Sequence, residues 1–458
     1  MGLREKVLRG GLYLVLRQGA GTILGVLSVL LVTRAIGPGA YGVYAAAQGV
    51  GQFVLQLAQL GVGMYLIRAK EVGEDDLHQG FTAMALMGAV IILLSYPLGT
   101  LVHHFTEIEG VELATLLVLV FGAVQLVACV PLATLERKFE YRRIALVELS
   151  GQAIFLVTGV PLAWHGMGWL APLAGWVAQQ GLTSILYYIF SGYRPRLKWD
   201  RRILSPMLSY GVGYSVSIWI WQLRWLVNPL IVGRLAGAEA VGRVALAIRI
   251  VESLSFLKGI GWRLSIPALA HIQNRRESLI AAVEEGMVLQ VVASGSTFLA
   301  FSFVAPWIVG TLLGGEWDGV VSIYPLLAVA TLANSLFALH SSALYVIEKN
   351  MEVSRFHAVH LAILGAGAWL LVGEFGEIGY GWAEMAAMGS YVLLHWSLMR
   401  WIGCPNYRKS FVAGGAFGGA LFWPHLGILS MCPLAAWIAF PGTWRILLGY
   451  ARLLFGKT

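Results

Sequence analysis

The sequence is poor in charge and in cysteine. Asp, Glu, Lys and Arg together make up 12% of the 458 residues, whereas hydrophobic residues make up 58%. A soluble domain normally carries about 25% charged residues, so this composition excludes an ordinary water-soluble fold. The three cysteines, Cys129, Cys404 and Cys432, are scattered in or beside apolar runs. They indicate neither a disulfide framework nor a metal site.

The sequence also lacks the motifs of an enzyme. No nucleophile–base pattern and no cluster of metal ligands stands out, so we expect no catalytic residue, no metal and no cofactor. The absence of a Gly-x-x-x-x-Gly-Lys-Ser/Thr loop argues against energy from direct ATP hydrolysis. The loops between the apolar runs leave no room for a separate catalytic domain. We therefore predict that the protein is not an enzyme.

What the sequence does contain is a series of long apolar runs. About fourteen of them approach or reach the roughly 20 residues that a membrane-spanning helix needs, and twelve is the alternative count. Strands of membrane barrels are only about 10 residues long and alternate in polarity, so run length favours helices. The last two runs, 410–423 and 425–440, are short enough to be re-entrant. The prediction is an all-α polytopic membrane protein with about 14 transmembrane helices, 12 plus 2.

Positive charge is concentrated in every second loop, as in 137–143 and 194–202, and the net charge is +8. The alternate loops contain only Arg34, Arg234 and Arg243 as basic residues. Because basic loops stay on the cytoplasmic side, we expect both termini in the cytoplasm. The excess charge needs no partner beyond anionic lipid headgroups, and nucleic-acid binding is not expected.

A stretch of the sequence occurs twice. Residues 30–61 recur without a gap at 230–261. The identical pairs are Leu30 and Leu230, Val32 and Val232, Arg34 and Arg234, Gly37 and Gly237, Ala40 and Ala240, Gly42 and Gly242, Ala45 and Ala245, Ala47 and Ala247, Leu57 and Leu257, and Gly61 and Gly261. The offset covers six predicted helices, an even number, so both copies have the same orientation in the bilayer. This predicts two six-helix lobes related by a parallel repeat, residues 1–198 and 199–400, followed by two extra helices and a cytoplasmic tail in 401–458.

Three segments carry a resemblance to a known family. Arg34-Ala-Ile-Gly-Pro-Gly-Ala-Tyr-Gly42 resembles the R-x-L-G-P-x-x-Y-G turn of bacterial polysaccharide (Wzx-type) flippases, in the multidrug/oligosaccharidyl-lipid/polysaccharide exporter superfamily. Leu135-Glu-Arg-Lys-Phe-Glu-Tyr-Arg-Arg143 is similar to that family's basic loop between helices four and five. Val232-Gly-Arg-Leu-Ala-Gly-Ala-Glu-Ala-Val-Gly242 is similar to its second-lobe turn. Asn228 departs from the pattern, because many members carry Asp inside helix seven.

The resemblance implies a function. It implies a flippase of the bacterial inner membrane that moves undecaprenyl-pyrophosphate-linked oligosaccharide units by alternating access, for surface polysaccharide biosynthesis. Its partners would be the lipid-linked oligosaccharide and membrane lipid. A proton or sodium is the candidate coupling ion. The protein would be a monomer, and polysaccharide polymerase or assembly proteins are its candidate contacts. The alternatives are a drug/cation antiporter of the same superfamily and, less favoured, a membrane glycan polymerase or ligase.

Five basic residues fall inside predicted spans: Arg17, Arg224, Arg249, Lys258 and Arg263. A charge near the bilayer centre costs about 2.5–3.5 kcal/mol or more, so each needs a pathway, a partner or an exit to the interface. Counted from Gly237, Arg224 is 13 residues before the turn and Arg249 is 12 after it, which predicts nearly equal depths.

Two interpretations of these cations remain open. In the first, they line a cavity and bind a pyrophosphate, for which guanidinium groups are well suited. In the second, Arg249 pairs with Glu252 one turn later, while Arg17, Lys258 and Arg263 extend to the membrane surface.

Helix two of the prediction carries Gln48, Gln52, Gln56 and Gln59, whose spacings of four, four and three place them on one helical face. Together with Gln222 they are candidates for binding sugar hydroxyls, and hydrogen bonding between helices is the alternative. Candidates for ion coupling are Glu252, Glu384 and Asn228.

Overall fold

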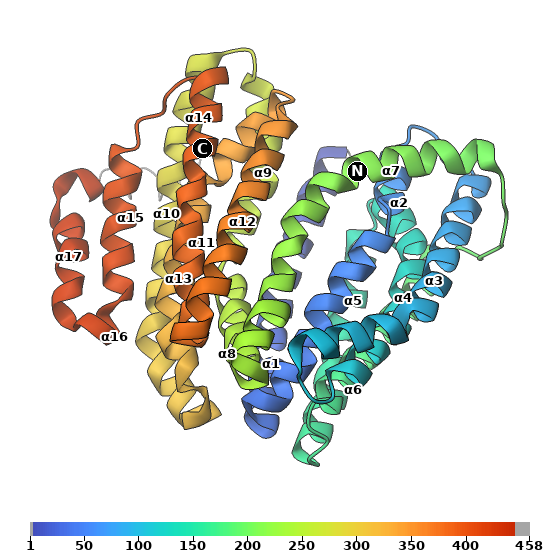
Figure 1. Ribbon diagram of the computed structural model, residues 1–458. Helices are drawn as coiled ribbons and strands as arrows, with labels where there is room; N and C mark the ends of the chain where they lie inside the picture. The colour runs from blue at the N-terminus through green and yellow to red at the C-terminus, as the bar shows by residue number, and fades with distance from the viewer. Residues whose placement is uncertain (1–2, 445–458) are drawn as a thin grey trace. The chain divides into compact units, whose positions relative to one another are not determined.

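The computed structural model (Figure 1) describes residues 3–444. Within that range it leaves undescribed the side chains of residues 3–20, 22, 23, 213, 214, 217, 260, 262–264 and 267. All regular secondary structure in the described part is helical, which confirms the predicted all-α fold.

The helices follow one another through short connections. In chain order they are α1 (Leu3–Ala58), α2 (Val62–Arg68), α3 (Glu74–Thr106), α4 (Val111–Arg137), α5 (Tyr141–Trp164), α6 (Leu170–Ser191), α7 (Arg201–Gln222), α8 (Gly233–Leu254), α9 (Phe256–Ile272), α10 (Arg276–Trp307), α11 (Asp318–Val346), α12 (Asn350–Phe375), α13 (Glu377–Ala387), α14 (Tyr391–Trp401), α15 (Arg408–Leu421), α16 (Trp423–Leu426) and α17 (Cys432–Ala439). Short 3-10 or π segments, η1 (Leu223–Leu226), η2 (Val227–Val232), η3 (Ile308–Leu313), η4 (Gly315–Trp317), η5 (Met388–Ser390) and η6 (Ile428–Met431), join or extend them.

Several of these helices are built to cross a membrane. Among the described residues, seven helical segments are long and apolar enough to do so: 24–58, 74–106, 111–137, 141–164, 276–313, 315–346 and 350–375. The chain is therefore a multi-pass membrane protein, and the total of 14 spans stays a prediction. In the short run predicted at 410–423, α15 has 14 residues, or about 21 Å at 1.5 Å per residue, which is less than the roughly 30 Å of a bilayer core.

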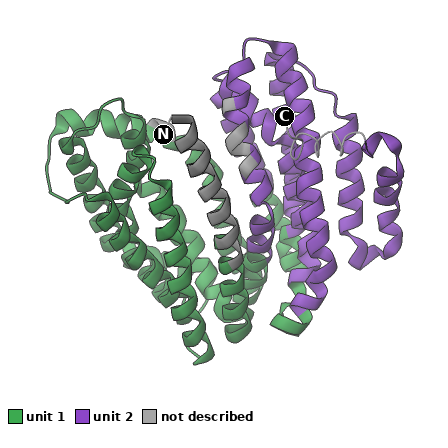
Figure 2. Cartoon of the chain, turned by 180° about the vertical axis from the view of Figure 1, so that it is seen from behind, with its two compact units in different colours: residues 1–246, 310–319, 364–380 green, residues 247–309, 320–363, 381–458 purple. Residues whose placement is uncertain are grey.

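Contacts group the chain into two units, drawn in different colours in Figure 2. The first comprises residues 1–246, 310–319 and 364–380, and the second comprises 247–309, 320–363 and 381–458. These boundaries differ from those of the predicted lobes 1–198 and 199–400, whose division stays a prediction.

In the first unit, α3 packs along α4 and α5 packs along α6, while α1 contacts both α4 and α5. Leu55 of α1, Met84 of α3 and Leu126 of α4 meet in a fully buried cluster. In the second unit, α10 contacts α9 and α15, and α15 contacts α17. Here Val353 and Phe356 of α12 pack with Tyr391 and Leu394 of α14.

The two copies of the repeated sequence share an unusual backbone conformation at the predicted turn. Gly37 has φ 74° and ψ 170°, and Gly237 has φ 76° and ψ −175°. Positive φ is strained for any residue with a Cβ, so glycine is required at both positions. A single glycine thus interrupts the helix in each copy, as the sequence predicted.

The two turns also contact each other within the first unit, and the contact is reciprocal. A Cβ added to Gly42 would overlap the carbonyl oxygen of Ala238, and one added to Gly242 would overlap the carbonyl oxygen of Pro38. Pro38 and Ala238 occupy equivalent repeat positions, 200 residues apart. Small residues allow such close backbone approach where hydrophobicity gives little driving force for helix association.

Replacing Gly42 or Gly242 by Ala should therefore separate the two turns. We expect each variant to lose about 1–3 kcal/mol of stability, the usual cost of overpacking. The measurement is the thermal unfolding midpoint of the purified protein in detergent. Gly181→Ala in α6 is the matched control, because a Cβ there meets nothing within 4 Å. Equal melting of Gly42→Ala and Gly181→Ala would contradict the close contact.

Candidate functional site

Arg224 lies in an irregular stretch of backbone. The regular helix α7 ends at Gln222, and the chain continues through the 3-10 segment η1 and the π segment η2. The guanidinium carbon of Arg224 lies 4.8 Å from the ring centroid of Trp221, which is a cation–π distance. Short 3-10 and π stretches inside long helices frequently occur at functional sites.

The sequence explains this irregularity. Pro229 has no N–H to donate, so the regular pattern of helical hydrogen bonds cannot continue through η2. Gly49 of α1 packs against the same place, where an added Cβ would lie 3.0 Å from Pro229 Cγ and 3.1 Å from the Trp225 carbonyl oxygen. A glycine on α1 thus allows that helix to approach the irregular backbone.

Asn228, a candidate for ion coupling, is buried in η2 with only 7% of its surface exposed. Its Nδ2 donates to the carbonyl oxygen of Val241 at 3.2 Å. Its Oδ1 is buried and has no hydrogen-bond partner among the described residues. An unsatisfied buried acceptor costs about 1–3 kcal/mol, so it marks a strained or functional position.

The glutamines of α1 form a partial ladder. Gln52 Nε2 donates to Gln48 Oε1 at 3.3 Å, and Gln48 Nε2 donates to the Tyr44 hydroxyl at 3.1 Å. The backbone carbonyl oxygen of Gln56, not its side chain, accepts from Trp219 Nε1 of α7 at 3.3 Å. The Oε1 atom of Gln222 is buried without a hydrogen-bond partner among the described residues.

Gln59 lies at the very end of α1, where its N–H still donates to the Leu55 carbonyl oxygen at 3.2 Å. Helix α1 ends at Ala58, so Gln59 lies in the turn that follows it. In that turn Leu60 has φ 47° and Gly61 has φ 65°, and Gly61 packs backbone to backbone against Gly211 of α7. Three of the four glutamines thus lie within α1 and the fourth directly follows it, and their common face stays a prediction.

In the second unit, Lys258 is half-buried and its Nζ donates to Asn334 Oδ1 at 2.7 Å. Arg249 and Glu252 are both exposed, and no ion pair joins them among the described side chains. Glu384 is buried in α13 with 6% of its surface exposed. The side chains of Arg17 and Arg263 lie outside the described residues. The predicted equal depth of Arg224 and Arg249 stays a prediction.

Sequence reasoning missed a cluster of polar contacts in the first unit. Arg34 donates to the Leu312 carbonyl oxygen at 3.0 Å, and Arg243 donates to the Glu316 carbonyl oxygen at 2.8 Å. Arg243 also pairs with Glu239 at 3.1 Å and with Glu377 at 3.3 Å. These contacts tie the two glycine turns to the segments around 312–316 and 377.

Arg234 completes this cluster through an ion pair with Glu107. The hydrogen bond from the guanidinium, together with its charge, holds the pKa of the Glu107 carboxyl below its usual value. Arg34, Arg234 and Arg243 are the three basic residues that depart from the alternating pattern of basic loops. The structure explains the exceptions, since each of these arginines has a specific partner.

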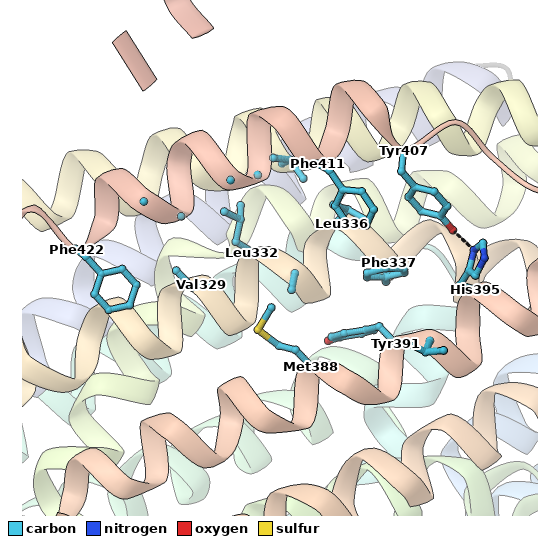
Figure 3. Close-up of a pocket in the computed structure, with 17 residues that line it drawn as sticks. Val329, Leu332, Leu336, Phe337, Met388, Tyr391, His395, Tyr407, Phe411 and Phe422 are labelled. Atoms are coloured by element: carbon cyan, nitrogen blue, oxygen red, sulfur yellow. Dashed lines mark hydrogen bonds between the residues drawn. The ribbon is translucent and has the colours of Figure 1, made fainter. Parts of the chain in front are cut away.

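The second unit also contains an apolar cavity of about 710 Å³ (Figure 3). Leu336, Phe337, Met388, Tyr391 and Phe411 line it, together with glycines 414, 415, 418 and 419 of α15. The glycines leave one face of α15 without side chains, which opens the space.

One end of the cavity is polar. The Tyr407 hydroxyl lies 2.8 Å from His395 Nδ1 and 2.6 Å from Nε2 of the buried His340. A single hydroxyl can donate to one ring nitrogen and accept from the other. No motif of the sequence pointed to this network, because its members are 12 and 67 residues apart.

Comparison of the sequence with known families gives one clear match. Residues 31–322 match the family model described as "Polysaccharide biosynthesis protein". The amylovoran biosynthesis protein AmsL of Erwinia amylovora is 26% identical over 53% of this chain and 62% of its own length. The lipopolysaccharide biosynthesis protein WzxC of Escherichia coli K12 is 24% identical over 44% of this chain and 42% of its own length. Both matches thus span less than two thirds of the relative.

The fold resembles that of solved transporters. The lipid II flippase MurJ in an inward closed conformation superimposes with a TM-score of 0.74, covering 96% of this chain and 99% of MurJ at 13% identity. An inward-facing multidrug resistance MATE family transporter gives a TM-score of 0.68, covering 83% and 94% of the two chains at 16% identity. At such identities these comparisons show the fold alone.

The unsatisfied oxygen of Asn228 leads to a prediction about stability. Asn228→Asp would bury a carboxylate in place of an amide and lose the donor to Val241, so we expect a loss of about 3 kcal/mol or more. Asn228→Leu removes the unsatisfied oxygen together with the donor and should cost less. Thermal unfolding of both purified variants measures the difference. An aspartate variant as stable as the leucine variant would show that the site accepts a charge.

Proposed function

Because the chain belongs to the polysaccharide biosynthesis protein family, we propose that it is a flippase for lipid-linked oligosaccharides. The family match over residues 31–322 is the observation that carries the proposal. It confirms the resemblance of the Arg34–Gly42 turn to the Wzx-type flippases. The proposed substrate is an undecaprenyl-pyrophosphate-linked repeat unit, moved from the inner to the outer leaflet of the bacterial cytoplasmic membrane.

The chemistry of the candidate residues supports this substrate. A pyrophosphate headgroup is anionic, and arginine binds phosphate oxygens through two parallel hydrogen bonds. Arg224 and Lys258 lie in helical segments of the protein and supply positive charge there. The ladder of Gln48 and Gln52 on α1 offers amide donors and acceptors of the kind that bind sugar hydroxyls.

Alternating access is the proposed mechanism. The headgroup would travel through the protein while the lipid tail remains in the bilayer. The reciprocal contact of Gly42 and Gly242 is a suitable gate, because it consists of backbone surfaces without interlocking side chains. Outward movement of a net anion is favoured by a membrane potential that is negative inside, by about 2.3 kcal/mol per charge per 100 mV. Asn228 and Glu384 are the proposed positions for a coupling proton or sodium.

The proposed orientation places both termini in the cytoplasm. Arg34, Arg234 and Arg243, with their contacts around Glu107, Glu316 and Glu377, would then lie on the outer side of the membrane. Their fixed partners account for these three exceptions to the rule that basic residues lie in cytoplasmic loops. We propose a monomer that hands its substrate to polysaccharide polymerase or assembly proteins. A drug/cation antiporter shares the fold, so the charge of the substrate decides between the two functions.

The cations can be tested by glycan export. The Arg224→Ala/Arg249→Ala double variant should lower export at least about tenfold, because a hydrogen bond to a charged group contributes about 1.5–3 kcal/mol. The measurement is the lipid-linked oligosaccharide reaching the outer leaflet in a strain lacking its own flippase, with wild-type protein as the reference.

A matched control removes the same charge elsewhere. Arg275 and Arg276 are both exposed where α10 begins, so Arg275→Ala/Arg276→Ala should retain export. Full export by the Arg224/Arg249 variant would remove these two residues from the substrate path. Failure of the wild-type protein to restore export of any lipid-linked glycan, combined with efflux of cationic dyes, would favour the antiporter instead.

A further inference from the structure

A pocket with basic walls lies between the start of α12 and the end of α14. Residues 350–363 of α12 and the whole of α14 belong to the second unit (Figure 2). The two helices pack in one buried cluster, and Ser397 Oγ of α14 donates to Glu352 Oε2 of α12 at 3.1 Å. The pocket beside this hydrogen bond has a volume of about 350 Å³, and its polar walls are Glu352, Arg355, Ser397 and Arg400.

The two arginines of the pocket are held in different ways. Arg355 NH1 lies 3.3 Å from Glu352 Oε1, so this guanidinium has a carboxylate partner. The exposed Arg400 has its guanidinium carbon 5.3 Å from the ring centroid of Trp401, and no carboxylate pairs with it among the side chains that the structure describes. Lys349 Nζ lies 3.7 Å from the centroid of the same ring. With two arginines and one glutamate in its walls, the pocket carries a net positive charge.

The pocket lies near one end of a helix that is built to cross a membrane. Helix α12 is one of the segments long and apolar enough to do so. Its 26 residues span about 39 Å at about 1.5 Å per residue, close to the 40–45 Å of a bilayer with its headgroups. Glu352 and Arg355 lie within the first two turns of α12 and are therefore at the depth of the lipid headgroups.

An apolar face of α14 leads away from the arginines. Val392, Trp396 and Met399 are 61%, 65% and 46% exposed, and their spacings of four and three place them on one face of the helix. Trp396 and Met399 also line the pocket. Exposed tryptophan is typical of the interface between membrane and water. A charged wall and an apolar face thus meet in one pocket.

From the charge, the depth and the apolar face, we propose that this pocket binds the headgroup of an anionic phospholipid of the surrounding membrane. Guanidinium groups bind phosphate oxygens well, and Arg400 and Arg355 supply two of them. The acyl chains of the lipid follow the apolar face of α14. A soluble phosphate would gain nothing from that face, and a zwitterionic lipid carries an ammonium group that offsets its own phosphate. The proposal does not depend on the proposed flippase function.

The experiment titrates full-length protein in detergent with phosphatidylglycerol, and separately with phosphatidylcholine of the same acyl chains. Native mass spectrometry measures the fraction of protein with bound lipid. We expect the wild type to bind phosphatidylglycerol at least about tenfold more tightly, because a hydrogen bond to a charged group is strong, and added salt should reduce this preference. Arg400→Gln should lose most of the preference by weakening the binding of phosphatidylglycerol alone.

Two further variants separate the site from a general effect of charge. Arg408→Gln makes the same change at an exposed arginine where α15 begins and should bind phosphatidylglycerol as the wild type does. Arg400→Lys keeps the positive charge and should keep the preference. Because a ligand stabilises the state that binds it, phosphatidylglycerol should raise the melting temperature of the wild type and of Arg408→Gln more than that of Arg400→Gln.

Three results would overturn the proposal. The first is equal affinity of Arg400→Gln and the wild type for phosphatidylglycerol, and the second is equal affinity of the wild type for the two lipids. The third is displacement of phosphatidylglycerol by an equal concentration of glycerol 3-phosphate, which would indicate a site for a soluble phosphate. None of these results bears on glycan export, so the proposed function depends on its own test.

Discussion

A lipid bilayer offers no water to a charged side chain, so each cation inside a helix needs a partner or a route to the interface. The described residues meet this constraint in two ways. At the turns, Arg234 and Arg243 pair with carboxylates, which cancel their charge. Within the helical segments, Arg224 lies over an indole ring and Lys258 donates to an amide oxygen. Both arrangements hold a cation in a defined place, the first through carboxylates and the second with an indole ring or an amide among the contacts.

Backbone contact is the second constraint on this fold. Helices in lipid gain little from hydrophobic association, so close packing between small residues has to hold them together. Gly42 and Gly242 allow a backbone carbonyl group of each repeat copy to approach the backbone of the other copy. Gly49 allows α1 to approach the irregular backbone at Pro229. Glycines also leave open space where no neighbouring helix packs against them, as on the face of α15 that lines the cavity. Glycine therefore produces both close contacts between helices and one wall of the cavity.

Local sequence information predicted the local structure well. Run length predicted that the chain is helical, and the repeated glycine predicted the interruptions at Gly37 and Gly237, because positive φ is a property of one residue and its neighbours. The contact between Gly61, after α1, and Gly211 of α7 could not be predicted, since the two glycines are about 150 positions apart along the chain. The partners of Arg34 and Lys258 were hidden for the same reason: they are 278 and 76 residues away along the chain. Such pairings depend on tertiary packing, which cannot be predicted from the periodicity of the sequence.

The residues around the cations are a more direct guide to the charge of the proposed substrate than the helical fold is. Flippases and multidrug transporters share this helical architecture, as the similarity to both solved structures illustrates. Among the cations within the helical segments, Arg224 lies over the Trp221 ring, and Lys258 donates to the Asn334 amide. An arginine or lysine of this kind suits the anionic headgroup of the proposed substrate, because guanidinium and ammonium groups donate hydrogen bonds to phosphate oxygens. The placement of these cations is thus the feature on which the proposed substrate depends, and neutral neighbours such as the Trp221 ring and the Asn334 amide help to set it.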